Sequence, residues 1–168
     1  ANGTGNVETF TEANGKTYLV AGENGVYSAH EYAVEITHIS LDPTNDALGY
    51  KAELIGDDVV KAHVKSIGFN LWVNEGNVKT YSKTGKNTVT LRLKNILHNN
   101  GGEMNINATA FVIFGEVTKT SQQQTITMKQ TLQMVNSAWE TYSETQQAAV
   151  KALCDQYYAT VSTWDLDN

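Results

Sequence analysis

The pattern of hydrophobic and polar positions changes once along the chain. From Thr17 to about Met128, short runs of alternating apolar and polar residues are separated by turn-forming segments. A period of two is typical of antiparallel strands that bury one face. From Met128 onward, apolar residues recur at steps of three and four, which is the period of an amphipathic helix.

The alternating part predicts a mainly β fold. In "NTVTLRL", Val89, Leu91 and Leu93 share one side, and the run ending at Phe114 alternates in the same way. About seven such strands over roughly 110 residues predict an immunoglobulin-like antiparallel β-sandwich spanning residues 17–126. The Gly-, Asn- and Thr-rich residues 1–16 are expected to be a flexible leader or linker.

The C-terminal part predicts a two-helix hairpin over residues 127–168 that packs on the sandwich within the same domain. Thr127 with Gln130 and Ser143 with Gln146 each fit a capping box at a helix start. The two apolar stripes consist of Met128, Leu132, Val135, Trp139 and Tyr142, and of Val150, Leu153, Tyr157 and Val161. Such stripes need a surface to cover, because a two-helix unit alone is thin.

The stretch "GFNLWVNEGNV" places Trp72 on the opposite face from Phe69 and Leu71. If "NEGN" forms a four-residue turn, Trp72 lies opposite Lys79, and Asn70 lies opposite Tyr81. Two interpretations follow. The helical pair covers Trp72, which is the favoured one, or the indole is an open platform for a ligand.

Composition and charge argue against several classes of function. The net charge is −6, and the twelve Lys and Arg residues are outnumbered and scattered, which disfavours binding to nucleic acid or an anionic membrane. No apolar run reaches the ~18–20 residues of a membrane span, so no membrane insertion is expected. The first residues lack the features of a secretory signal, so any signal peptide was removed or never present. Cys154 is alone, so no internal disulfide exists.

Catalytic, cofactor and metal motifs are not found in the sequence. The four histidines lack metal-ligand spacing, and Cys154 falls within a helical stripe rather than beside a catalytic base. The acidic turns "LDPTND" and Asp57–Asp58 leave calcium binding open, but capping of turns by Asp and Asn is favoured. Because a small sandwich also offers little cleft, a non-enzyme without a cofactor is expected.

Sugar binding remains possible because aromatic faces stack on sugars while amides and charged groups bind hydroxyls. Three candidate sets are Trp72 and Tyr81 with Asn70 and Lys79, then Tyr27 with Tyr32, and finally Trp164 with Tyr158. For each set taken alone, a structural role is favoured over a binding role.

The segments "ISLDPTNDALGYKAEL", "GFNLWVNEGNV", "NTVTLRLKNIL" and "GGEMNINATAFV", followed by the helical region, resemble an accessory domain of large secreted or surface proteins of gut Firmicutes. Such domains sit beside immunoglobulin-like repeats, dockerins or carbohydrate-active modules. The resemblance covers about residues 32–168 and brings no catalytic motif with it. It implies an extracellular or cell-surface location and a non-catalytic role.

The sequence therefore predicts a monomeric, non-catalytic carbohydrate-binding module, with an α-glucan such as starch as the best candidate ligand. The alternative is an immunoglobulin-like spacer or protein-docking domain that positions neighbouring modules of a larger surface protein.

Overall fold

The computed structural model describes residues 8–11, 15–23, 26–42, 47–94, 105–127, 130 and 139–158. The elements in chain order are β1 (Glu8–Thr11), β2 (Thr17–Glu23), β3 (Val26–Asp42), β4 (Ala47–Ile55), α1 (Asp58–His63), β5 (Ser66–Val73), β6 (Lys79–Thr84), β7 (Thr88–Lys94), β8 (Asn105–Phe114), β9 (Val117–Thr120), β10 (Gln124–Thr127), the 3₁₀ turn η1 (Trp139–Thr141) and α4 (Glu144–Tyr158).

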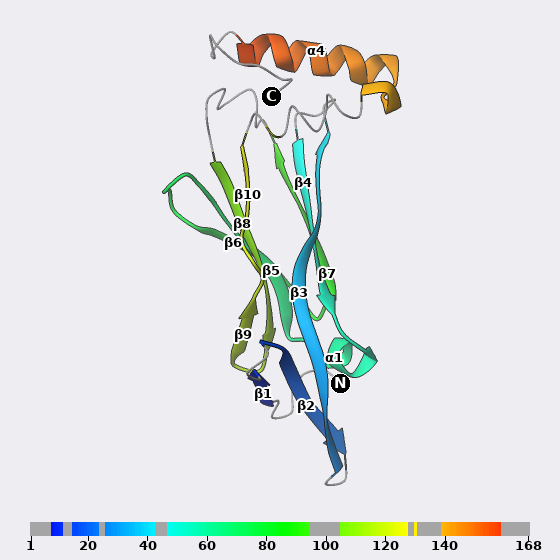
Figure 1. Cartoon of the computed structure of the whole chain (residues 1–168), viewed down its shortest axis with the longest axis vertical. Helices are drawn as coiled ribbons and strands as arrows, with labels where there is room; N and C mark the ends of the chain where they lie inside the picture. The colour runs from blue at the N-terminus through cyan, green and yellow to red at the C-terminus, as the bar shows by residue number, and fades with distance from the viewer. Residues whose placement is uncertain are drawn as a thin grey trace.

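Two antiparallel sheets pack around one hydrophobic core (Figure 1). The first sheet has the order β1-β2-β3-β4-β7, and the second has the order β10-β8-β5-β6 with β9 also paired to β8. The core combines side chains of both sheets, such as Leu48 and Tyr50 from β4 with Phe69 from β5 and Phe114 from β8. The molecule is thus mainly β, as the alternating pattern predicts.

Alternation decides which side chains enter the core. On β8 the residues that point inward are fully or almost fully buried, namely Ile106, Ala108, Ala110, Val112 and Phe114. On β7, Val89 is buried and Leu91 and Leu93 pack against the same core, while Thr90 and Arg92 are exposed. These inward faces match the sequence prediction because strands present successive side chains to opposite faces.

The long strand β3 has different partners along its length. Its first part pairs with β2 up to Tyr32, and its second part, from Ala33 to Asp42, pairs with β4. A register shift between Ile36 and His38 bends the strand at a bulge. Because β2 lies on the other side of β3, the edge of the second part that faces away from β4 has no ladder partner among the described strands.

Several short elements were not expected from the sequence, among them β1 and α1. Glu8–Thr11 forms β1 and pairs with β2, so the predicted leader contains a strand, and the Phe10 and Tyr18 rings stack at 5.2 Å. Helix α1 begins after Asp57, whose Oδ1 accepts the N–H of Val60 at 3.0 Å. The "DD" turn is therefore a helix N-cap, and Val60 buries its side chain in the core. Both elements are too short to show a periodicity of their own.

The predicted register of the β5–β6 hairpin is wrong by one residue. Lys79 lies opposite Leu71, and Tyr81 lies opposite Phe69. The cause is in the turn, because Trp72 and Val73 stay paired with β8 while β6 separates from β5. Asn74 then adopts φ 53°, and the N–H of Gly76 donates to the carbonyl of Val73 at 2.8 Å.

Both predicted capping boxes are present at the C-terminal end of the described chain. The N–H of Thr127 donates to Gln130 Oε1 at 2.8 Å, and the N–H of Gln130 donates to Thr127 Oγ1 at 3.1 Å. Ser143 and Gln146 exchange the same two bonds at 3.0 and 3.2 Å before α4. The first predicted helix otherwise lies mostly outside the described residues, so only the second helix of the proposed hairpin is described.

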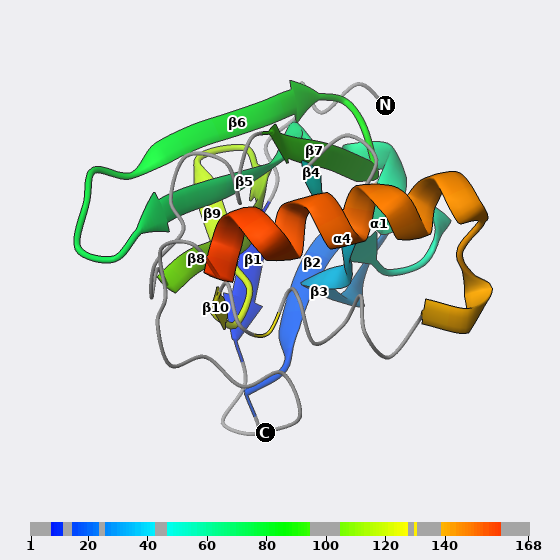
Figure 2. The ribbon, with the colours of Figure 1, turned by 90° about the horizontal axis from the view of Figure 1, so that it is seen from above.

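Helix α4 lies across one end of the two sheets, beyond the start of β4 and β8 and the end of β10 (Figures 1 and 2). The prediction that the helices lie flat on a sheet face is therefore wrong for α4. The prediction that the helical pair covers Trp72 concerns mainly the first helix, which lies mostly outside the described residues. Trp72 is only partly buried. Its sheet face is a poor seat for an apolar stripe, because its neighbours there include Asn70 and Asn107.

Gly68 allows an unusually close approach between β5 and its neighbours. A Cβ at this position would overlap the carbonyl oxygen of Tyr81 and would lie 2.6 Å from Cζ of Phe111. Phe111 is the cross-strand partner of Gly68 and is only 6% exposed although it points away from the core. The Phe111 ring thus packs directly against the backbone of β5 at a residue without a side chain.

We expect Gly68→Ala to lower the free energy of unfolding by about 1–3 kcal/mol, because the added methyl must displace the Phe111 ring or the β6 backbone. Gly49→Ala is the control, since its nearest neighbour atom would lie at an ordinary 3.5 Å, on Ser40. Urea unfolding of the two variants measures the difference. Equal stability of the two variants would contradict the close-packing account.

Candidate functional site

Trp72 lies on the face of the second sheet that points away from the core, called here the outer face. Cross-strand pairing places Asn107 of β8 opposite Trp72, and Thr125 of β10 opposite Asn107. One row along, Asn70 lies opposite Thr109. The outer face is therefore polar around a single indole, because each of these residues occupies the non-core position of its strand.

The indole borders an open hollow of about 580 Å³, called here the Trp72 hollow. The residues that line it are Trp72, Asn74, Glu75, Asn105, Asn107 and Gln123. They come from the end of β5, the following turn, the start of β8 and the segment before β10. Because the turn directly continues β5, three separate chain segments meet around one aromatic ring.

Asn107 holds this hollow together. Its side chain is almost fully buried, and its amide donates to the carbonyl oxygens of Trp72 at 3.4 Å and Asn74 at 3.3 Å. Its Oδ1 accepts bonds from Thr125 Oγ1 at 2.8 Å and Gln123 Nε2 at 3.2 Å. A buried amide needs such partners, so Asn107 has a structural role that fixes Trp72 relative to β10.

Asn74 fastens the turn to β8. Its N–H donates to the carbonyl of Asn105 at 2.8 Å, and the N–H of Asn105 donates back to Asn74 Oδ1 at 2.9 Å. The positive φ of Asn74 is tolerated because Asn adopts the left-handed region more easily than most residues. The exposed Glu75 carboxylate, which forms no ion pair within the described chain, is left at the rim.

The hollow offers one aromatic surface, amide groups and a carboxylate within one open depression. This combination suits a polyhydroxylated ligand, since a ring stacks on C–H groups while amides and carboxylates exchange hydrogen bonds with hydroxyls.

The structure separates the predicted set of Trp72, Tyr81, Asn70 and Lys79 into two faces. Asn70 shares the outer face with Trp72, and its Oδ1 accepts a bond from Thr80 Oγ1 at 2.8 Å. Tyr81 and Lys79 lie opposite Phe69 and Leu71, so they project on the other side of the sheet. The one-residue register error explains this correction, because a shift by one residue moves every side chain of a strand to the other face.

The other predicted aromatic sets do not form a described site. Tyr27 is 67% exposed, whereas Tyr32 is buried, with its ring centre 4.8 Å from that of Phe114 in an edge-to-face arrangement. Their separation of five residues puts them on opposite faces of β3. Trp164 and the side chain of Tyr158 lie outside the described residues.

Sequence reasoning missed the partners of Trp72. The alternating pattern places Asn105 and Asn107 on the side of β8 that faces away from the core, but it does not connect that side with Trp72. The same pattern identifies Asn74 and Glu75 only as turn residues. The available signal was the recurrence of Asn in the turn after Trp72, at Asn74 and Asn77, and at the start of β8, at Asn105 and Asn107. Only the pairing of β5 with β8 brings these segments together.

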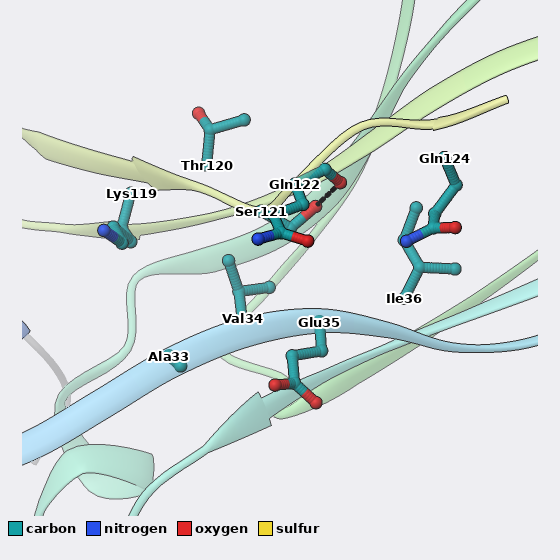
Figure 3. Close-up of a pocket in the computed structure, with 9 residues that line it drawn as sticks. All are labelled: Ala33, Val34, Glu35, Ile36, Lys119, Thr120, Ser121, Gln122 and Gln124. Carbon is teal, nitrogen blue, oxygen red and sulfur yellow. Dashed lines mark hydrogen bonds between the residues drawn. The ribbon is translucent and has the colours of Figure 1, made fainter. Parts of the chain in front are cut away.

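A second hollow, of about 440 Å³, lies between the two sheets along their open side (Figure 3). Val34 and Ile36 of β3 face Ser121, Gln122 and Gln124 across it, while Glu35 points away. Ser121 lies between β9 and β10 and binds the edge of β8 through its side chain. Its Oγ accepts the N–H of Ala110 at 2.8 Å and donates to the carbonyl of Gln122 at 2.9 Å. This hollow contains no aromatic side chain.

A hydrogen-bonded relay of Ser28, His30 and Asp57 ties the β2–β3 hairpin to α1. His30 Nδ1 lies 2.6 Å from Asp57 Oδ2, and Ser28 Oγ lies 2.8 Å from His30 Nε2. The order of groups matches that of acyl-transfer triads, but such chemistry also needs oxyanion donors and a bound acyl group. Ser28 lines neither of the two hollows described above. We therefore interpret the relay as a structural link.

The Asp57 carboxylate is held in its ionised form. The N–H of Val60 and then the hydrogen bond with His30 lower the pKa of Asp57 below its ordinary value of 3.8. A carboxylate whose pKa is lower in the folded state stabilises the fold above its unfolded pKa. That contribution is lost as the pH falls through the lowered value.

We expect the melting temperature to fall as the pH falls below about 4, partly through Asp57, and Asp57→Asn to reduce this part of the fall. Asparagine retains an oxygen for the helix N-cap, so the variant mainly removes the negative charge beside His30. Asp58→Asn is the neighbouring control. The assignment is wrong if the two variants show the same dependence of melting temperature on pH.

A scan against protein-family models finds no match, and a search of curated proteins finds no similar sequence. Within the described residues no group of three His, Cys, Asp or Glu side chains is placed to bind a metal ion. None of the described helices has the length and hydropathy of a membrane span.

Proposed function

We propose that this chain is a non-catalytic carbohydrate-binding module and that the Trp72 hollow is its binding site. The observation that carries the proposal is a partly exposed indole beside amide groups and a carboxylate in one open hollow. The hydrogen bonds of Asn107 and Asn74 fix the walls before any ligand arrives, so little ordering cost is left for binding.

Within this class, an α-glucan such as starch is the proposed ligand, and an extracellular or cell-surface setting is proposed with it. Both steps rest on the resemblance to accessory domains of modular surface proteins. A single platform in an open hollow gives weak affinity, so binding through neighbouring modules of the same protein would strengthen attachment.

The proposed fold type is immunoglobulin-like. Strands β3, β4 and β7 are neighbours in one sheet, and β10, β8, β5 and β6 are neighbours in the other. This order supports the assignment, because β3, β4 and β7 then take the places of strands A, B and E of an immunoglobulin-type sandwich. Strands β10, β8 and β5 take those of G, F and C, and β6 takes that of C′ in the variable type.

The second candidate function is a spacer or protein-docking domain. The observation that favours it is β6, an edge strand whose six residues are all exposed. Docking would use the edge strand β6, whereas sugar binding would use the Trp72 hollow, to which β6 contributes no residue, so the two functions are compatible.

We expect Trp72→Ala to weaken binding to soluble starch or a malto-oligosaccharide about tenfold or more, because the variant removes the stacking surface. The free energy of unfolding should change little, since Trp72 lies outside the core. Affinity electrophoresis and calorimetry with starch, xylan, pectin and mucin glycans measure the effect.

Tyr27→Ala is the matched control, because it removes an exposed aromatic ring from the other sheet. Binding to none of these glycans would overturn the proposed function. Binding that survives Trp72→Ala but is lost in Tyr27→Ala would place the site elsewhere. A misfolded Trp72→Ala variant would show that the indole has a structural role.

A further inference from the structure

Strand β6 ends the second sheet and is fully open to solvent. It pairs with β5 on one side, and no described strand pairs with its other side. All six of its residues, from Lys79 to Thr84, are exposed. An edge of this kind presents unpaired backbone N–H and C=O groups.

The chain concentrates its positive charge around this strand. Seven of the twelve Lys and Arg residues fall between residues 59 and 94, together with only one of the eighteen acidic residues, Glu75. The expectation that the positive charges are scattered is therefore wrong for this part of the chain. An acidic protein carries here a locally basic segment that comprises α1 after Asp58, together with β5, β6 and β7.

Register places three side chains of β6 in one row, namely Lys79, Tyr81 and Lys83. Their partners on β5 are Leu71, Phe69 and Ile67, so the row projects on the same side of the sheet as these core residues. Lys65, Lys79 and Lys83 form no ion pair with any described residue. The row is therefore an aromatic ring flanked by two lysines without acidic partners in the described chain.

The backbone of β6 offers hydrogen bonds at alternate positions. The N–H of Gly85 donates to the carbonyl of Lys65 at 2.8 Å, which continues the ladder through the odd-numbered residues of β6. Hydrogen-bonded and non-bonded pairs alternate along an antiparallel ladder. The N–H and C=O groups of Thr80 and Ser82 therefore point away from β5, towards the open edge.

We propose that β6 is a docking edge for an extended acidic peptide segment of a protein partner, which adds to the second sheet as a further antiparallel strand. Main-chain bonds to Thr80 and Ser82 would supply affinity. Acidic side chains two residues on either side of an apolar one would meet Lys79 and Lys83, with the apolar residue against Tyr81. This inference does not depend on the proposed sugar site.

Lysines on an edge strand also oppose pairing between two copies of that strand, since like charges would meet. The same charges favour pairing with a strand of opposite charge. The lysines that oppose self-association therefore also select an acidic partner. An acidic polysaccharide could use the lysines, but it would leave the backbone groups of Thr80 and Ser82 without strand partners. The open edge therefore favours a peptide.

The test uses the full chain labelled with ¹⁵N and the peptide acetyl-Thr-Glu-Thr-Val-Thr-Glu-Thr-amide. Titration should shift the amide signals of Thr80 and Ser82, and binding should weaken when NaCl rises from about 0.05 M to about 0.5 M. The control peptide has the same sequence and charge but carries N-methyl groups on the two Thr residues that flank Val. It should bind about tenfold more weakly or worse, because it cannot donate the main-chain bonds.

Two variants separate the contributions. Lys79→Glu with Lys83→Glu should reduce affinity about tenfold or more, whereas Lys16→Glu with Lys119→Glu, which changes the net charge equally, should have little effect. Ser82→Pro removes one outward N–H at a position where an edge strand tolerates proline, and it should also weaken binding. Circular dichroism confirms the fold of each variant.

Equal binding of the N-methylated peptide would overturn strand addition in favour of simple charge attraction. Binding of polygalacturonate without binding of the peptide would overturn the choice of a protein partner, and binding of neither would overturn the site. Trp72→Ala should leave peptide binding unchanged, so failure of this inference can be told apart from failure of the sugar site.

Discussion

The pairing of β5 with β8 is the constraint on which the surfaces of this molecule depend. It sets Trp72 opposite Asn107 and Gly68 opposite Phe111, and it buries Phe69 and Leu71 on the other side. A shift of one residue would exchange the two faces of β5. The core therefore enforces the register strongly, because the wrong alternative would bury Asn70 and Trp72 in place of two apolar side chains.

On the outer face of the second sheet, the buried side-chain amide of Asn107 has hydrogen-bond partners at both its nitrogen and its oxygen. Asn107 uses both ends of its amide to join the last residues of β5, the following turn and β10. A buried amide in an incomplete network would cost stability, whereas a complete network fixes one geometry. The indole of Trp72 is thereby held at the side of an open hollow, which is the arrangement a preformed binding surface requires.

The β5–β6 hairpin gives the molecule two different surfaces. The outer face carries Asn70 and Thr80 beside Trp72, and the opposite side of β6 carries Lys79, Tyr81 and Lys83. Charge is also unevenly divided, because the segment around β6 is basic while the rest of the chain is acidic. At physiological ionic strength screening acts over about 8 Å, so a ligand close to β6 experiences mainly the local positive charge.

The sequence by itself determined the strands that bury one face, the inward residues of β7 and β8, and the capping boxes at Thr127 and Ser143. These features arise from local periodicity and local hydrogen bonding, which neighbouring residues specify. Tertiary structure decided the hairpin register, the position of α4 at the end of the sheets and the assembly of the Trp72 hollow from three segments. Those features depend on pairings between residues far apart in the chain. Strand β5 stays paired with β8 through Trp72 and Val73 instead of closing a tight turn with β6 at these residues. An alternating pattern alone does not distinguish between these two pairings.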